Sequence, residues 1–133
     1  MSKTQYIVGR RYEYLLMRIF KRRGFYVIRA PASGKGSRSF FYPDIIALNH
    51  ERKILVECKF SDVDQDIYLS KNRVRKLRWI ADKILAEAYV CVYFTSIGGF
   101  RCLRLSDFSR ETEKNYIYSF KKFSEDGLDP EKI

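Results

Sequence analysis

The chain has little of what a secreted or membrane-spanning protein needs. Its three cysteines, Cys58, Cys91 and Cys102, are odd in number, widely spaced and embedded in apolar runs, and no C-x-x-C pair occurs. This pattern favours free buried thiols in a reducing compartment. No stretch approaches the roughly 20 apolar residues that cross a bilayer, and the first residues show no apolar signal core. We therefore expect a soluble, intracellular protein of the cytoplasm.

Acidic residues and histidine are also scarce. Lysine and arginine number 26 against 16 aspartates and glutamates, which gives a formal net charge of +10. Such an excess favours a polyanion as partner, because a basic surface gains free energy by displacing the counterions of a phosphate backbone. A basic surface that serves only solubility is the alternative. The one histidine, His50, falls in a predicted turn without a partner, which disfavours an RNA-processing nuclease with a histidine general base.

The length and the apolar content indicate one folded unit. With 133 residues and 46% hydrophobic content, the chain is large enough to bury one core and too small for two. We therefore predict a single domain over residues 1–133. The tail from about residue 121 is polar and ends with acidic residues, so we expect it to be partly disordered.

Apolar periodicity predicts two long helices, and runs of β-forming residues predict the strands between and after them. The helices are expected from Gln5 to Arg23, stopped by Gly24, and from Ser70 to about Glu87, with Ser70 as N-cap. The strands are expected at residues 25–28, 44–48, 54–60, 88–95 and 100–105. This order predicts an α/β fold with a central mixed β-sheet of about five strands flanked by helices.

The strand at 54–60 carries an unexpected pair of charges. Glu57 and Lys59 are two residues apart and therefore face the same side of the strand. Burying them costs several kcal/mol per ion unless something compensates. If the hairpin turns at His50 and Glu51, residues whose numbers sum to 101 pair across it, and Asp44 lies opposite Glu57. The turn lacks Asn-Gly or Asp-Gly, so the register stays open by one or two residues.

Two carboxylates facing each other in a sheet repel, and a hard divalent cation between them removes the repulsion. With Mg²⁺ held by Asp44 and Glu57, Lys59 would orient or deprotonate a water that attacks a phosphate. A cross-strand ion pair without chemistry is the alternative. A second acid-x-Lys triplet, Glu51-Arg52-Lys53, lies in the predicted turn, where we interpret it as solvated.

Pro43-Asp44 followed by Glu57-Cys58-Lys59 resembles the PD-(D/E)xK nuclease motif. Three further segments narrow the resemblance to the archaeal Holliday-junction resolvases: Gly9-Arg10-Arg11-Tyr12-Glu13, Val27-Ile28-Arg29-Ala30-Pro31-Ala32-Ser33-Gly34 and Arg110-Glu111-Thr112-Glu113-Lys114-Asn115-Tyr116. This resemblance implies a restriction-endonuclease-like fold. It also implies a homodimer with twofold symmetry that binds four-way junction DNA and nicks two opposed strands, using Mg²⁺ or Mn²⁺.

The same resemblance implies a set of site residues. The catalytic residues would be Glu13, Ser33, Asp44, Glu57 and Lys59, and the metal-binding residues Glu13, Asp44, Glu57 and Cys58. Without the resemblance, Glu13 could simply pair with a neighbouring arginine. Ser33 could likewise belong to an ordinary Ser-Gly turn.

Basic residues flank the acidic motif on both sides along the chain. The residues expected to bind DNA are Arg10, Arg11, Arg29, Lys35, Arg38, Lys71 and Arg73. Cations around metal-bound carboxylates suit phosphate positioning, so we expect recognition by shape with steep salt dependence. Arg73 stands where many related nucleases have a glutamine, and it is either a phosphate contact or an exposed helix residue.

Two rival functions remain open from the sequence. One is another PD-(D/E)xK DNA nuclease, which would cut linear duplex as well as a mobile junction. The other is a non-catalytic basic DNA-binding module, in which junction binding would survive Asp44→Ala and Mg²⁺-dependent nicking would be absent from the unmutated protein.

Overall fold

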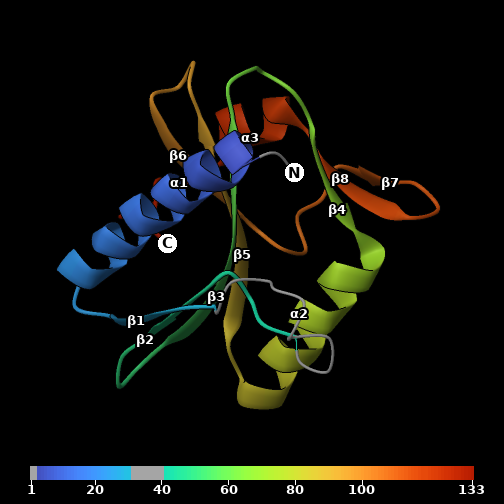
Figure 1. Cartoon of the computed structure of the whole chain (residues 1–133). Helices are drawn as coiled ribbons and strands as arrows, with labels where there is room; N and C mark the ends of the chain where they lie inside the picture. Colours follow the sequence, from blue (N-terminus) through green and yellow to red (C-terminus); the bar gives the residue numbers. More distant parts are fainter. Residues whose placement is uncertain (1–2, 31–40) are drawn as a thin grey trace.

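The computed structural model of the chain describes residues 3–30 and 41–133 (Figure 1). It contains helices at both ends of the chain and two β-sheets. The helices are α1 (Lys3–Arg22), α2 (Lys71–Ile84) and α3 (Phe120–Asp126). The strands are β1 (Tyr26–Arg29), β2 (Ile45–Leu48), β3 (Lys53–Ser61), β4 (Ile67–Ser70), β5 (Glu87–Phe94), β6 (Gly99–Arg104), β7 (Arg110–Glu111) and β8 (Asn115–Tyr118).

The larger sheet has five strands in the order β1-β2-β3-β5-β6. Its central pair, β3 and β5, is parallel, and the other neighbours are antiparallel, so the sheet is mixed. The predicted α/β fold with a mixed sheet of about five strands is therefore confirmed. In Figure 1, α1 lies on one side of this sheet, and α2 with the smaller sheet lies on the other.

Each face of the larger sheet has its own buried cluster. Ile54, Val56 and Cys58 of β3 pack with Leu16 and Phe20 of α1 on one face. On the other face, alternate residues of β5 pack with Val74 and Leu77 of α2. Burial on both faces explains why β3 and β5 read as nearly continuous apolar runs. It also means that Glu57, whose neighbours in β3 face α1, projects toward α2.

The start of α2 follows the predicted capping. Ser70 is extended, and its side-chain oxygen accepts a hydrogen bond from the Arg73 backbone N–H at 3.1 Å, as an N-cap should. The helix ends at Ile84 rather than near Glu87, because Leu85 adopts a left-handed conformation with φ of 56°. Glu87 is already the first residue of β5.

The smaller sheet was not expected from the sequence. It has three strands in the order β4-β8-β7, all antiparallel. Its strands are two to four residues long, and β4 pairs with a strand almost 50 residues later in the chain. Such short strands carry little alternation, so their pairing depends on the tertiary fold. The sheet positions the start of α2, which follows β4 directly.

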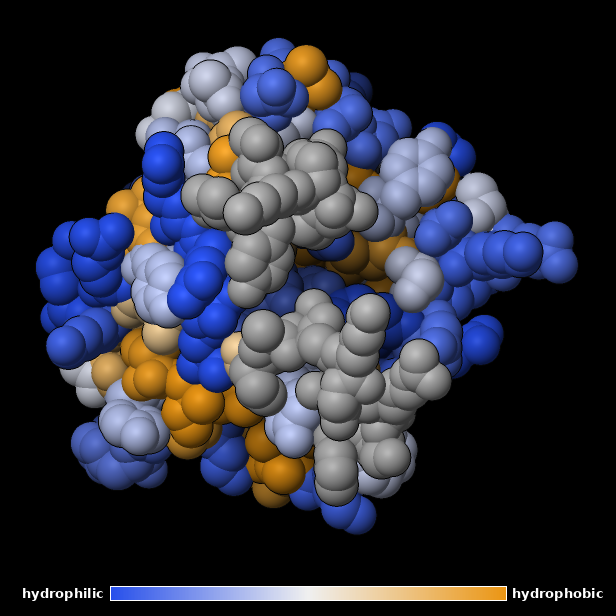
Figure 2. Space-filling model, in the orientation of Figure 1, coloured by the Kyte–Doolittle hydropathy of each residue, from blue (hydrophilic) through white to orange (hydrophobic). Residues whose placement is uncertain are grey.

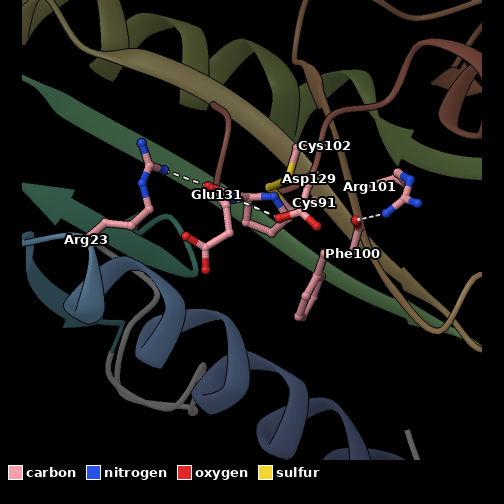
Figure 3. Close-up of a disulfide and its surroundings, with 8 residues drawn as sticks. Arg23, Cys91, Phe100, Arg101, Cys102, Asp129 and Glu131 are labelled. Atoms are coloured by element: carbon pink, nitrogen blue, oxygen red, sulfur yellow. Dashed lines mark hydrogen bonds between the residues drawn. A yellow bond between two sulfur atoms is a disulfide. The ribbon is translucent and has the colours of Figure 1, made fainter.

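The tail differs from the expected partial disorder. It forms α3, whose Phe123 is fully buried, and then an isolated bridge in which Leu128 and Cys102 exchange backbone hydrogen bonds of 2.7 and 2.9 Å. Arg23 donates hydrogen bonds to the backbone carbonyl oxygens of Pro130 and Ile133 at 2.6 and 2.7 Å. Figure 3 shows Arg23 reaching across to this segment. The expectation of disorder rested on the acidic composition of the tail, which gives no indication that a few apolar residues attach it to the rest of the fold.

The cysteines differ in part from the prediction of free thiols. Cys91 of β5 and Cys102 of β6 lie directly opposite each other and form a disulfide (Figure 3). For this pair the prediction is wrong, because spacing along the chain did not show that the hairpin register would bring the two together. Cys58 is free and buried, as predicted.

The surface is in keeping with the charge of the chain. Figure 2 shows a face on which hydrophilic residues dominate and hydrophobic residues form smaller patches. Across residues 3–30 and 41–133, no helix is long and apolar enough to cross a bilayer.

Candidate active site

The hairpin of β2 and β3 brings the two motif carboxylates together. Ile45 pairs with Val56 and Ile46 with Leu55, so the predicted register, in which paired numbers sum to 101, is confirmed. Asp44 immediately precedes β2 and lies next to Glu57 in this register. Its Oδ2 accepts a hydrogen bond of 2.9 Å from the backbone N–H of Cys58. The orientation of the Asp44 carboxylate is thereby set by the backbone of β3.

Glu57 is a buried acid in the middle of the larger sheet. Its side chain is only 2% exposed, and both of its carboxylate oxygens accept hydrogen bonds from Arg73. The pKa of Glu57 is raised to about 7, mainly by burial. The hydrogen bond from Arg73 lowers this pKa, and the nearby charge of Asp44 raises it. Burial is the main cause, so the Glu57 carboxyl is harder to ionise in the folded protein than in water.

Arg73 bridges the two acids from the first turn of α2. Its Nη2 donates to Glu57 Oε1 at 2.7 Å and to Asp44 Oδ1 at 3.3 Å, and its Nε donates to Glu57 Oε2. The sequence suggested a phosphate contact or an exposed helix residue, and neither interpretation anticipated this bridge. Only the N-cap at Ser70, which starts α2, was a local signal for its position.

Glu13 lies near the acid pair but has its own arginine. Its Oε2 accepts hydrogen bonds from Arg29 Nη2 at 3.1 Å and Nε at 3.3 Å, and the two side chains are 19% and 18% exposed. Burial raises the pKa of Glu13, and so does the charge of Asp44, while Arg29 lowers it. The arginine pairing that the sequence left open is thus present, with a partner on β1 instead of on α1.

The remaining motif residues of β3 have different surroundings. Lys59 is exposed, and its charge lowers the pKa of Glu57. Burial raises the pKa of the Cys58 thiol, and the charges of Asp44 and Glu13 raise it further. A protonated buried thiol is a poor ligand for a hard cation, so the Cys58 side chain fits the predicted metal set least.

The predicted metal ligands are near one another without forming one cluster. Across residues 3–30 and 41–133, no group of three or more His, Cys, Asp or Glu side chains is arranged to hold a metal ion. Asp44 and Glu57 share Arg73, whereas Glu13 faces Arg29. The acid pair still fits Mg²⁺ in the chemistry of its donors, because both ligands are hard oxygens and a cationic group already lies between them.

The residues predicted to bind DNA fall into three groups. Arg10 and Arg11 are exposed on α1. Arg29, Lys71 and Arg73 take part in ion pairs, and Lys71 contacts Glu111 at 2.6 Å and lies over the Tyr116 ring. Lys35 and Arg38 lie outside the described residues, as does Ser33, which was predicted to be catalytic.

The β2–β3 hairpin of the mixed sheet carries two carboxylates and a lysine, which is the grouping expected of a PD-(D/E)xK nuclease. The family model of the archaeal Holliday junction resolvases (Hjc) matches residues 4–133, which is almost the whole chain. The chain therefore belongs to the archaeal Holliday junction resolvase family.

Individual relatives agree with this assignment. The chain is similar to the crossover junction endodeoxyribonuclease Hjc of Sulfolobus acidocaldarius, with 32% identity over 78% of this chain and 70% of that protein. The protein of the same name from Sulfurisphaera tokodaii is 39% identical over 59% of this chain and 54% of its own length. The 1.6 Å structure of Archaeoglobus fulgidus Hjc, a Holliday junction resolvase, superposes with a TM-score of 0.81 and 29% identity, covering 93% of this chain and 98% of that one.

Proposed function

We propose that this protein is a structure-selective, metal-dependent endonuclease that binds four-way DNA junctions as a dimer and nicks two opposed strands by hydrolysis. The observation that supports this proposal best is the juxtaposition of Asp44 and Glu57 across the β2–β3 hairpin, with Lys59 on the same strand. Family membership adds to it, since two relatives are named crossover junction endodeoxyribonucleases.

Asp44 and Glu57, with Glu13 at the edge of the site, would hold Mg²⁺, for which Mn²⁺ could substitute. When bound, this metal would neutralise charge on the scissile phosphate and lower the pKa of its water. The rigid strand β3 fixes Glu57, and the Cys58 N–H orients Asp44, so neither carboxylate needs to reorganise much on binding. Lys59, exposed beside them, would orient the attacking water or, as the neutral amine, take up its proton.

The charge of the chain suits a branched DNA substrate. A net charge of +10 attracts phosphates without reading bases, and exposed Arg10 and Arg11 on α1 are suited to contact the backbone. A four-way junction has approximate twofold symmetry, and a dimer with an isologous interface would present two sites to two opposed strands.

A labelled four-way junction tests the proposal under three conditions: the protein with Mg²⁺, the protein with Ca²⁺, and Glu57→Ala with Mg²⁺. We expect junction binding in all three and cutting only in the first. Cutting of linear duplex at a similar rate would point instead to another PD-(D/E)xK nuclease. Junction binding by the unmutated protein without Mg²⁺-dependent cutting would point to a non-catalytic DNA-binding module.

A further inference from the structure

Every oxygen of the Asp44–Glu57 pair already accepts a hydrogen bond. Three of the four accept from Arg73, namely both oxygens of Glu57 and Oδ1 of Asp44. The fourth, Asp44 Oδ2, accepts from the backbone N–H of Cys58. The planar guanidinium fork matches a carboxylate with two parallel N–H groups, which makes this a strong and directional contact.

The contacts of Arg73 compensate for the cost of burying Glu57 next to a second carboxylate. Glu57 is 2% exposed, and a buried carboxylate next to a second one is strongly unfavourable unless a cation accompanies it. Arg73 is attached to a rigid helix that begins at the N-cap Ser70, so it reaches the pair from a fixed position. The protein thus carries its own cation at the place where the proposed function needs a metal.

We propose that the Arg73 guanidinium is an internal counter-cation that holds Asp44 and Glu57 together in the metal-free protein and leaves both when a divalent cation binds them. This inference rests on the proposed function, because it takes these two carboxylates as the metal ligands. The physical reason is competition, since Arg73 occupies three of the four oxygens that the metal would use.

Arg73 has other contacts that would keep it close to the site after displacement. Its Nη2 donates to the backbone carbonyl of Tyr42 at 3.4 Å, and its guanidinium carbon lies 4.9 Å from the centre of the Phe41 ring. Both partners immediately precede Pro43-Asp44. A guanidinium released from the acids would therefore remain beside the metal, where it adds positive charge for an approaching phosphate. Because Arg73 acts by holding the two acids in place, it is a positioning residue.

Binding of Mn²⁺ alone, measured by calorimetry, tests the competition without any cleavage assay. We compare Arg73→Gln with Arg75→Gln, because Arg75 is an exposed arginine two residues farther along α2 and its loss removes the same charge. Arg73→Gln should bind Mn²⁺ at least roughly tenfold more tightly than Arg75→Gln, because a charge-assisted contact no longer competes. Arg73→Lys should fall between them, since it keeps the charge and loses the fork. Equal affinity of Arg73→Gln and Arg75→Gln would overturn the proposal.

A second measurement uses the unmutated protein and so does not depend on whether a variant folds. The side-chain Nε–H of Arg73 should give a distinct ¹⁵N–¹H signal in EDTA, because it is hydrogen-bonded to Glu57. Saturation with Mg²⁺ should move this signal to the position of solvated arginines or broaden it. A signal that stays unchanged at saturation would show that Arg73 remains on the carboxylates and would refute the displacement.

Glu57→Gln separates failure of this inference from failure of the proposed function. If Mn²⁺ affinity is the same with and without this substitution, the metal does not use the acid pair, and both proposals fail. If Glu57→Gln weakens Mn²⁺ binding while Arg73→Gln and Arg75→Gln bind equally, the metal site stands and only the counter-cation role is wrong.

Discussion

Two arginine–glutamate pairs lie along β3, and the same bidentate contact is accompanied by opposite pKa shifts of the two glutamates. Just before the strand begins, Arg52 donates to both oxygens of Glu87 at 2.8 Å. Farther along the strand, Arg73 donates to both oxygens of Glu57. The pKa of Glu87 is lowered by the hydrogen bond from Arg52, whereas burial raises the pKa of Glu57 to about 7. The opposite directions show that the bidentate contact alone does not decide the charge state.

The difference comes from exposure and from the number of acids. The Arg52 and Glu87 side chains are 31% and 28% exposed, and each has water as a second source of solvation. Glu57 is 2% exposed and shares its arginine with Asp44. Glu87 has Arg52 as its hydrogen-bonded arginine and Arg104 nearby, whereas Arg73 is shared by two acids. The second site therefore places two carboxylates side by side, as a metal site requires, and the first is a structural bridge.

The largest expected effect separates the two glutamates in catalysis. Glu57→Gln should lower Mg²⁺-dependent junction cutting by about three orders of magnitude, because it removes a proposed metal ligand. Glu87→Gln, with the same loss of charge, should leave the cutting rate nearly unchanged. Single-turnover assays on a labelled junction, with binding measured in Ca²⁺, check both variants. If Glu57→Gln and Glu87→Gln lowered the cutting rate by similar factors, the two glutamates would not differ in function as proposed.

The pH dependence of stability should have opposite signs at the two glutamates. Because the pKa of Glu57 rises from its ordinary 4.5 to about 7 on folding, its contribution is full below 4.5 and is lost as pH rises toward 7. The lowered pKa of Glu87 makes a contribution that is present above 4.5 and is lost as pH falls.

Urea unfolding in EDTA measures both contributions. Between pH 4.5 and 7, the unfolding free energy of Glu57→Gln should rise relative to the unmutated protein by at most about 3 kcal/mol. For Glu87→Gln the relative unfolding free energy should fall as pH rises through the region around 4.5. A pH-independent difference for Glu57→Gln would show that this acid is not desolvated in the folded protein.

Glu13 offers an intermediate case, since it has one arginine and is 19% exposed, yet burial raises its pKa. If it completes the metal site, Glu13→Gln should lower cutting by roughly 10 to 100-fold while junction binding persists. Glu51→Gln, in the exposed turn, is the matched control and should cut at the normal rate. A rate for Glu13→Gln equal to that of the control would limit Glu13 to pairing with Arg29.

The smallest effect concerns the structural bridge. A double-mutant cycle with Arg52→Gln and Glu87→Gln should give a coupling of about 1 kcal/mol in the unfolding free energy, because a partly exposed pair is screened by solvent. Chemical denaturation of the four proteins measures it. A coupling several times larger would mean that the bridge resembles the buried pair more closely than its exposure suggests.

The parts of the fold that the sequence predicted are those with a local pattern. The run from Ile54 to Phe60 identified β3, and the position of the turn at His50 and Glu51 identified its register with β2. The smaller sheet was missed because its strands are short and pair across long stretches of chain. The tail was misjudged because the buried residues that anchor it, Phe123, Pro130 and Ile133, stand among charged ones.

At the site, the sequence by itself determined that Asp44, Glu57 and Lys59 would share one hairpin, because strand periodicity and hairpin register are properties of neighbouring residues. Only the tertiary structure decided which cations meet these acids. Arg73 reaches Glu57 from a helix 16 residues later. That approach depends on how α2 packs against the sheet, and the same packing removes the water that would otherwise stabilise the charge on Glu57.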